Sequence, residues 1–377
     1  MMDAIDWRLA QRVGERIAGS PPRGGVRAAA VQPLVHDFAH RVSAYSALPE
    51  PDALPPLETV DRSEWIAANL RSMRPLLGPL SERLGDGAGA LSGPLRSASG
   101  FLLGAQVGAL TGVLSQRVLG QYDLALLDSA APPRLLLLAP NLVIGARNMD
   151  VDRDELVLWV SIHEITHAVQ FSAAPWLREH LGGMLRELID GLQVTLSGRF
   201  GAGQEQDAVA GEAPPRGRLP RLPDAGELRE LVERARRGEL LRMTLGEDRW
   251  QLVERIQATM SLIEGHAEHT MDAVGAEVLP TMPALRTAMT RRRQSRPLPW
   301  RVLERLLGLE LKLRQYEIGR RFCDAVVAEE GTHALAWAWS GPHSLPSLAE
   351  LDSPEAWLAR VREARASGRT DVPPVTK

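Results

Sequence analysis

One five-residue motif constrains this sequence more than any other feature. Residues 163–167 read HEITH, so two histidines stand four positions apart with a glutamate beside the first. On an α-helix this spacing places His163 and His167 on one face, where both imidazoles can bind the same cation. A helix over about 152–171 is predicted, because Asp152 can cap its first turn and acidic residues follow where the helix dipole favours them. The sequence therefore predicts a metal-binding helix.

The residue types in the motif indicate hydrolytic chemistry. A zinc ion lowers the pKa of water towards 7, and Glu164 stands where its carboxylate can take the proton as a general base. We therefore predict Zn2+ as the cofactor, with His163 and His167 as ligands. The longer metzincin pattern is absent, because Gln170 and Ala173 occupy the positions of its glycine and third histidine.

A third protein ligand is expected from a second long helix, predicted over residues 248–274. Its Glu264, Glu268 and Asp272 recur every four residues and share one face, where they repel one another unless a positive group faces them. We predict Glu264 as the third zinc ligand and Glu268 as an acceptor that holds a ligand histidine. His266 is the rival third ligand, on a different face from Glu268, and a solvated acidic stripe is the alternative without metal.

Glycines mark two predicted helix contacts. Gly265 lies inside the second long helix at a cost of about 1 kcal/mol relative to alanine, which a close approach of the HEITH helix would explain. Residues 97–116 carry no charge and contain glycines at a constant spacing of four: Gly100, Gly104, Gly108 and Gly112. This segment has nearly the length of a membrane span, but its polar residues and glycines lower its hydrophobicity. We predict a buried helix pressed against a neighbour, and no transmembrane anchor.

Most of the chain has the periodicity of helices, and one segment does not. Residues 135–144 form an apolar run interrupted by Pro140, which predicts one or two strands with the proline at an edge or bulge. We expect a mostly helical α+β protein with a small sheet and one continuous hydrophobic core. The expected parts are an N-terminal helical part over 1–130 packed on the core, a metal-binding core over 131–366 with a mobile insertion at 198–226, and a flexible tail over 367–377. A connector is expected over 280–299 and a long helix over 300–330.

Composition excludes several classes of protein. The 377 residues carry a net charge of −3, so no overall basic field attracts nucleic acid, and the arginine run at 291–293 is expected in a solvated loop. The single cysteine, Cys323, rules out a disulfide scaffold and a cysteine-based zinc finger. No apolar segment of a secretory signal follows the N-terminus, so we expect a cytoplasmic protein. None of these features predicts an oligomeric state.

Two further groups of residues have side chains suited to catalysis or metal binding. A hydrolase of this kind needs a donor to the oxyanion of the transition state, and Tyr316 and His269 are candidates, with core packing as the alternative for Tyr316. His36 and His40 also stand four residues apart, around Asp37, but no carboxylate-rich helix is evident to complete a site. We interpret His36 and His40 as structural.

Three segments together resemble a known family: HEITHAVQF at 163–171, SLIEGHAEHTMDAVG at 261–275 and LKLRQYEIGRRF at 311–322. They are similar to actinobacterial zincin-like proteins labelled zinc-dependent metalloproteases, candidate hydrolases or proteins associated with deazaflavin coenzyme biosynthesis. The resemblance extends from about Asp6 to about Trp357 and covers most of the chain.

The resemblance implies a zincin-like fold with a largely helical surround. It also implies His163 and His167 as zinc ligands, Glu164 as base and Glu264 as a third ligand of the gluzincin type. The leading prediction is a zinc-dependent hydrolase, most simply a metallopeptidase that acts on a peptide or protein. The alternative is a non-catalytic zincin scaffold, stabilised by zinc, that binds a partner protein; a link to deazaflavin cofactor metabolism rests on the family label.

Overall fold

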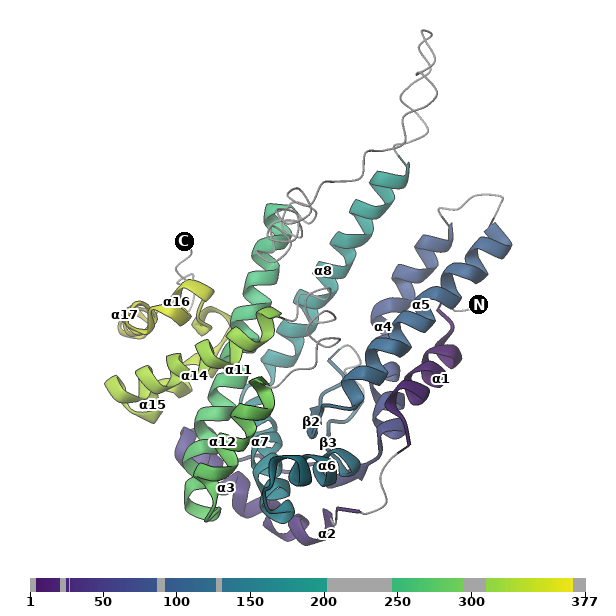
Figure 1. Ribbon diagram of the computed structural model, residues 1–377. Coiled ribbons are helices and arrows are strands. Elements are labelled where there is room, and N and C mark those ends of the chain that lie inside the picture. The colour runs from purple at the N-terminus through teal and green to yellow at the C-terminus, as the bar shows by residue number, and fades with distance from the viewer. Residues whose placement is uncertain are drawn as a thin grey trace, which may run out of the picture.

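The computed structural model describes residues 5–20, 25–26, 28–86, 92–126, 131–201, 246–294 and 310–368 (Figure 1). The N-terminal elements are α1 (Trp7–Ala18), α2 (Ala28–Val31), η1 (Gln32–Leu34), α3 (Val35–Ser46), β1 (Leu57–Val60), α4 (Arg62–Asp86), α5 (Ser92–Ser115), β2 (Gly120–Asp123) and β3 (Arg134–Leu138). They are followed by α6 (Ala139–Met149), α7 (Arg153–Ala173), α8 (Trp176–Gly201), α11 (Glu247–Val278), α12 (Met282–Gln294) and α14 (Glu310–Glu330). The last are α15 (Thr332–Leu335), η3 (Ala336–Ser340), η4 (Pro342–Ser344), α16 (Leu348–Asp352) and α17 (Pro354–Ser367). The mostly helical α+β class is confirmed.

The three strands form a small mixed sheet in the order β1-β3-β2. β1 runs parallel to β3, with Leu57 opposite Leu135, whereas β2 runs antiparallel to β3, with Gly120 opposite Leu137. The prediction for residues 135–144 was wrong in its second half. The strand ends at Leu138, and Pro140 stands in the first turn of α6, where the missing N–H of a proline costs nothing.

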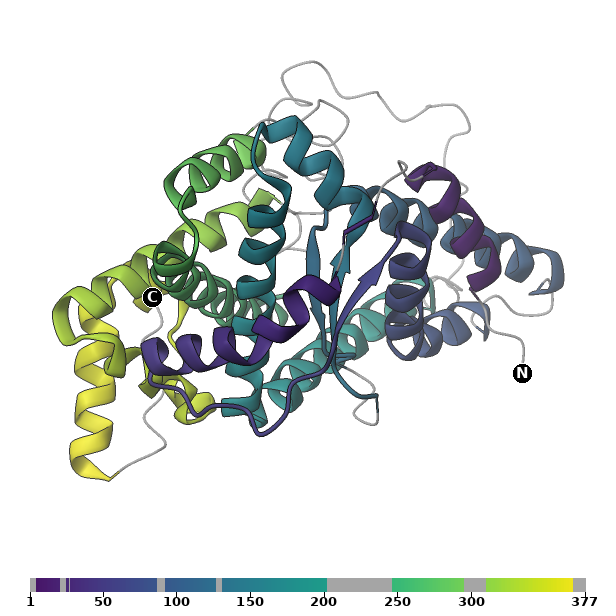
Figure 2. The same ribbon diagram turned by 90° about the horizontal axis from the view of Figure 1, so that it is seen from below.

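The sheet separates two hydrophobic clusters, whereas we had expected a single continuous core. Leu135 and Leu137 of β3 face the larger cluster, and Leu136 and Leu138, which point to the other face of the pleat, belong to the smaller one. The smaller cluster also takes side chains from α1 and α4. In Figure 2 the strands lie in the middle, with the purple and blue helices α1, α4 and α5 on one side and the green and yellow helices of the C-terminal half on the other.

The glycine-spaced segment is α5, and it is pressed against a neighbouring helix as predicted. The neighbour is α1, and α5 is not buried all round, because Phe101 and Leu102 are exposed. A Cβ atom at Gly104, Gly108 or Gly112 would lie 2.6, 2.2 or 2.5 Å from a backbone oxygen of α1 or of its cap residue Asp6. Only glycine permits two backbones to approach this closely. In the described part of the chain, no helix combines the length and apolarity needed to cross a bilayer.

Gly265 also marks a close helix contact, but its partner was predicted wrongly. A Cβ atom there would lie 2.1 Å from the carbonyl carbon of Gly319, which is on α14 and not on α7. The predicted connector at 280–299 was wrong as well, because residues 282–294 form helix α12. The arginines at 291–293 therefore stand in the last turn of a helix and not in a solvated loop, and Arg292 donates a hydrogen bond to the carbonyl oxygen of Arg117 at 2.7 Å.

Parts of the predicted organisation lie outside the described residues. Of the expected insertion at 198–226, residues 198–201 continue α8 and the remainder is not described. The same holds for 369–377 of the expected tail, whereas α17 extends to Ser367. The division of the chain near residue 130 stays a prediction; the sheet takes strands from both sides of that position.

Candidate metal centre

Helix α7 carries the HEITH motif and begins where the sequence predicts. The side chain of Asp152 caps it by accepting hydrogen bonds from the backbone N–H groups of Asp154 and Glu155, at 2.8 and 2.9 Å. The helix then runs through the interior, so that both Glu164 and His167 are buried. The motif is consequently held on a rigid helix with little freedom to rearrange.

Helices α7 and α11 bring three of the predicted ligands to one point. The Nε2 atoms of His163 and His167 are 3.2 Å apart, and Oε2 of Glu264 lies 3.7 Å from the first and 3.6 Å from the second. The three side chains are only 11–17% exposed. Among the described residues, these form the only group of three or more histidine, cysteine or acidic side chains close enough to share a metal ion, and His266 is not part of it.

The geometry of this group fits a tetrahedral metal site. With zinc–nitrogen and zinc–oxygen distances of about 2.0–2.2 Å, neighbouring ligand atoms of a tetrahedron lie about 3.3–3.6 Å apart. The distances between the atoms of His163, His167 and Glu264, 3.2–3.7 Å, are close to these values. Two imidazole nitrogens and a carboxylate oxygen directed at one point need a positive charge between them, and two histidines with one carboxylate are a donor set that zinc prefers.

The electrostatic surroundings of His167 favour positive charge at its ring. Burial alone would lower the pKa of this imidazole, but the Glu264 carboxylate, 3.6 Å from its Nε2, and the charge of Glu164 raise the pKa to about 9. Surroundings that favour a proton on Nε2 also favour a divalent cation at the same position. The electrostatics of the site therefore agree with its geometry.

Glu164 lies against the edge strand β2. Its Oε2 accepts a hydrogen bond from the backbone N–H of Tyr122 at 2.7 Å. A Cβ atom at Gly120 would lie 2.8 Å from Oε1 of Glu164 and 2.6 Å from a methyl group of Val160, so a glycine is needed at the start of this strand. Burial raises the pKa of Glu164 to about 7, although the charge of His167 and the bond from Tyr122 act in the opposite direction.

Gln170 connects the two metal-binding helices, a role that the sequence analysis missed. Its Nε2 donates hydrogen bonds to the carbonyl oxygen of Ile263 at 2.9 Å and to Nδ1 of His266 at 2.8 Å, which identifies the amide nitrogen. Its Oε1 is therefore the acceptor for the Nδ1–H of His167, at 2.8 Å. A histidine that donates through Nδ1 presents Nε2 to a metal, so Gln170 orients His167 as a ligand. The only sequence signal was its position, three residues after His167 on the same helix.

Comparison with known proteins is consistent with this centre. The profile of the zincin-like metallopeptidases matches residues 5–358. The chain belongs to this family. A crystal structure from Chloroflexus aurantiacus, described as a candidate hydrolase with a novel fold, is similar with 28% sequence identity and a TM-score of 0.62, over 95% of this chain and 99% of that one. A comparison with curated proteins finds no match. Membership of the family implies a metal site and supports a hydrolase.

His266, the rival ligand, occupies a different place in this zincin-like protein. It is fully buried with its ring edge-on to Trp339, at a centroid distance of 5.2 Å. Because its Nδ1 accepts from Gln170, its proton is on Nε2, and that atom has no hydrogen-bond partner among the described residues. Burial, together with the charges of His269 and His167, lowers its pKa to about 3, so the ring is neutral. His266 therefore supports the helix pair and does not face the ligand cluster.

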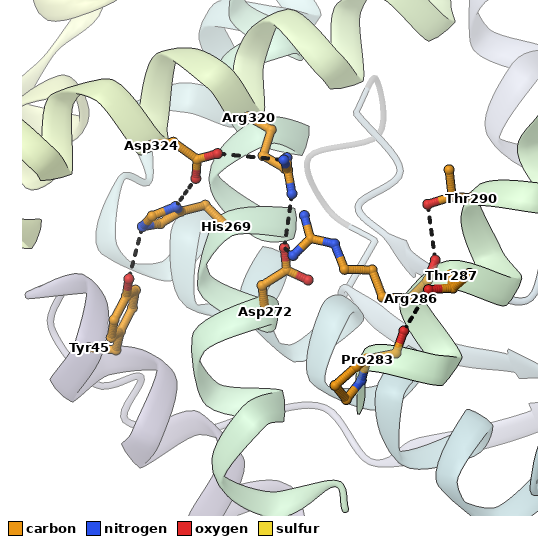
Figure 3. A network of polar contacts seen from close by, with 9 residues as sticks. All are labelled: Tyr45, His269, Asp272, Pro283, Arg286, Thr287, Thr290, Arg320 and Asp324. Atoms are coloured by element: carbon orange, nitrogen blue, oxygen red, sulfur yellow. Dashed lines mark hydrogen bonds and ion pairs between the residues drawn. The ribbon is translucent and has the colours of Figure 1, made fainter. Parts of the chain in front are cut away.

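The acidic stripe of α11 is divided between two environments. Glu264 faces the histidines, whereas Asp272 forms ion pairs with Arg286 of α12 and Arg320 of α14 (Figure 3). The positive groups that face Asp272 are therefore two arginines and not the predicted metal site. Glu268, which lies between these two acids in the sequence, is buried. Its role as an acceptor that holds a ligand histidine stays a prediction.

His269, one of the two predicted transition-state donors, is not part of the ligand cluster. His269 is five residues from Glu264 and so about 140° around the helix from it. Its ring nitrogens are engaged by the Tyr45 hydroxyl at 2.9 Å and by Asp324 at 2.7 Å (Figure 3). The side chain of Tyr316 lies outside the described residues, although its backbone belongs to α14. His40, which we interpreted as structural, forms an exposed pair with Glu50 at 3.1 Å.

Proposed function

We propose that this protein is a zinc-dependent hydrolase and, within that class, a metallopeptidase in which His163, His167 and Glu264 hold the zinc ion. The proposal rests on one observation: Nε2 of His163, Nε2 of His167 and Oε2 of Glu264 converge at the distances of a tetrahedral site. Two different helices supply these atoms, and His167 and Glu264 are 97 residues apart in the sequence. The family assignment supports it independently.

A bound zinc ion supplies Lewis acidity, which polarises a substrate carbonyl and lowers the pKa of water. Glu164 is the residue of this chain that moves the proton. The N–H of Tyr122 holds Oε2, so Oε1 is the oxygen that takes a proton from the attacking water and then delivers it to the leaving amine. Because α7 and β2 together fix the carboxylate, its orientation is set before substrate arrives.

The position of β2 favours a peptide as the substrate. β2 is an edge strand of the sheet, and its Tyr122 N–H points away from β3 towards Glu164. The edge of β2 that does not pair with β3 thus faces the candidate site. Its Tyr122 N–H is already bonded to Glu164, and an extended peptide can pair with other backbone groups of such an edge. This arrangement would place a scissile carbonyl near the ligand cluster without requiring a particular side chain.

The test compares the parent with Glu164→Gln, which removes the base and preserves the shape of the side chain. Both proteins are loaded with zinc, their zinc content is measured, and a mixture of unstructured peptides is searched for cleavage by mass spectrometry. We expect equal zinc content, cleavage by the parent that a chelator abolishes, and a loss of at least about 100-fold in the variant. Undiminished cleavage by Glu164→Gln would refute the mechanism. Bound zinc without cleavage of any peptide would favour the scaffold.

A further inference from the structure

Helices α1 and α5 lie together at one margin of the molecule, beside α4 (Figure 1 and Figure 2). Among the described residues, the two most exposed large apolar side chains are on α5: Phe101 is 59% and Leu102 is 58% exposed. No charged residue stands in 97–116, so the exposed side of α5 carries no charge over this stretch. A helix that is apolar on every side is normally covered on every side. The uncovered side of α5 therefore needs an explanation.

The apolar side chains of both helices continue on the side that faces away from α4. On α1, Gln11 donates a hydrogen bond to the carbonyl oxygen of Ser63 of α4 at 3.3 Å, and Leu9, two residues earlier, points about 160° away from it. On α5, Val107 packs against the smaller hydrophobic cluster, which includes side chains of α4. Ala105, two residues earlier, likewise points about 160° away from Val107. Leu9 and Ala105 are thus turned to the same side of the helix pair.

Parallel packing joins these side chains into one strip. Gly104 of α5 lies against Asp6 at the start of α1, and Gly112, two turns later, lies against a residue two turns further along α1. The strip therefore continues one turn later on each helix, with Val13 and Ala109. The four side chains of α5 span about 100° of its circumference. We call this strip the α1–α5 face; its members, all exposed or half-buried, are Leu9, Val13, Phe101, Leu102, Ala105 and Ala109.

A row of three arginines borders the α1–α5 face along α1. Arg8, Arg12 and Arg16 stand four residues apart, so they share one side of the helix, next to the apolar strip. All three are exposed, and none has a hydrogen-bond or ion-pair partner among the described residues. Glu15, the only acidic residue of α1, accepts a hydrogen bond from Ser63 of α4 instead. The row therefore places unpaired positive charge beside an exposed apolar strip.

We propose that the α1–α5 face binds the surface of a membrane that contains anionic lipids. The apolar side chains enter the boundary between headgroups and hydrocarbon, and the arginines beside them meet the lipid phosphates, which guanidinium groups bind in a bidentate geometry. Neither contribution depends on the candidate metal centre or on the hydrolase activity proposed above.

The chemistry of the face favours a lipid surface over a protein. Specific protein interfaces form about one hydrogen bond per 100–200 Å2, and no side chain of the α1–α5 face can form one. A second copy of this chain would bring a second row of unpaired arginines into the contact and add repulsion. Lipid hydrocarbon requires neither hydrogen bonds nor a matching shape, and lipid phosphates supply the negative charge that complements the arginines.

The test measures cosedimentation of the whole, zinc-loaded chain with vesicles of phosphatidylcholine, with and without about one third phosphatidylglycerol. We expect binding to the anionic vesicles to be at least about tenfold stronger than to the neutral ones at low salt, and to weaken as salt is added. Absence of binding to the anionic vesicles would overturn the proposal.

The Phe101→Ser/Leu102→Ser variant tests the apolar contact, and it leaves the interior intact because both side chains are exposed. We expect vesicle binding to fall about tenfold or more, with an unchanged melting temperature. Leu34→Ser changes an exposed leucine of η1 outside the face and should bind like the parent. Equal binding by Phe101→Ser/Leu102→Ser and the parent would overturn the proposal.

The Arg12→Gln/Arg16→Gln variant tests the row of arginines. We expect binding to the anionic vesicles to fall about tenfold or more. Arg147→Gln/Arg321→Gln removes two exposed arginines of α6 and α14, makes the same change in net charge and should bind nearly as well as the parent. An equal loss in the two variants would mean that binding follows net charge and not this face, which would overturn the proposal.

Two other occupants of the face would be revealed by the same variants. Self-association without vesicles, measured by analytical ultracentrifugation and abolished in Phe101→Ser/Leu102→Ser, would assign the face to a second copy of this chain. Binding of polyglutamate but not of vesicles, lost in Arg12→Gln/Arg16→Gln, would assign it to an acidic protein. Either result would overturn the assignment to a membrane.

Discussion

Two neighbouring residues of α11 face two different kinds of contact. Glu264 meets the side chains of His163 and His167 across a polar gap of more than 3.5 Å, a distance that a metal ion can bridge. Gly265, one residue later, meets the backbone of Gly319 with no room for a single methyl group. The comparison shows how the ligand is positioned. Backbone packing against α14 fixes the axis of α11. Because that axis is fixed, the carboxylate of Glu264 is held opposite the histidines of α7.

The largest predicted effect concerns the glycine contact. A Cβ atom at Gly319 would lie 1.8 Å from the carbonyl oxygen of Ser261, and neither backbone can move without separating the two helices. We expect Gly319→Ala and Gly265→Ala each to lower the free energy of unfolding by about 3 kcal/mol, although alanine is the better helix former. Urea unfolding followed by circular dichroism measures this.

Gly183 of α8 is the matched control, because a Cβ atom there would meet nothing within 4 Å. Gly183→Ala should leave the stability unchanged or raise it by up to about 1 kcal/mol. If Gly319→Ala proved as stable as Gly183→Ala, the α11–α14 contact would not be as close as described.

A smaller effect is predicted for the contact between α7 and α11, where Gln170 determines the affinity for zinc. Gln170→Leu removes the acceptor for Nδ1–H of His167 and the bonds to Ile263 and His266. We expect zinc affinity, measured by competition with a chromophoric chelator, to fall about 10- to 100-fold. Gln170→Glu keeps an oxygen acceptor for His167 and should retain most of the affinity.

This pair of variants separates orientation of the ligand from general loss of structure. Gln170→Glu places a carboxylate against the carbonyl oxygen of Ile263, so it should lower stability while preserving the affinity for zinc. A Gln170→Leu protein that binds zinc as tightly as the parent would show that Gln170 does not orient His167.

The smallest predicted effect is a pH dependence of the free energy of unfolding. It arises from His266, which lies on α11 but contacts neither the ligand cluster nor α14 through its Nδ1. His266 has a pKa of about 3 when folded because of its burial, against about 6.5 when unfolded. Between pH 6.5 and 3 the unfolded chain therefore binds a proton at His266 that the folded chain does not bind. The free energy of unfolding is highest above the unfolded pKa and declines as the pH falls from 6.5 towards 3. Between pH 6.5 and 5.5 the loss is about 1 kcal/mol.

The His266→Asn variant should not show this loss of stability between pH 6.5 and 5.5. Urea unfolding of parent and variant at both pH values, with a chelator present, excludes release of zinc from the comparison. The other acid-sensitive groups of the site, Glu164 and His167, are common to both proteins and cancel in the difference. Equal pH dependence of the parent and His266→Asn would mean that this imidazole titrates normally in the folded state.

The sequence predicted those parts of the site that local periodicity encodes. The start of α7 at Asp152 and the alignment of His163 with His167 depend on residues within a few turns of one helix, and helical spacing is sufficient to find them. Glu264 was found because an acidic stripe on an apolar helix needs a positive partner. His266 remained a rival until the three-dimensional arrangement placed it against Trp339.

What the sequence analysis missed depends on contacts between distant segments. Gln170 forms hydrogen bonds with Ile263 and His266, which follow it by 93 and 96 positions in the sequence. The residues next to Gln170 in the sequence do not indicate these partners. Gly265 correctly indicated a close approach, but a glycine does not specify which helix approaches. The apolar run at 135–144 concealed a strand end and a helix start, because both are buried and apolarity alone does not distinguish them.

The central claim is that His163, His167 and Glu264 bind one zinc ion, and the metal content of the purified, untagged protein tests it most directly. Elemental mass spectrometry should find close to one zinc per chain in the parent and almost none in a His163→Ala/Glu264→Ala variant. A His40→Ala/Glu50→Ala variant, which removes an exposed histidine–glutamate pair, should keep the zinc. A parent that holds no zinc even after reconstitution, or a His163→Ala/Glu264→Ala variant that holds as much as the parent, would contradict the account.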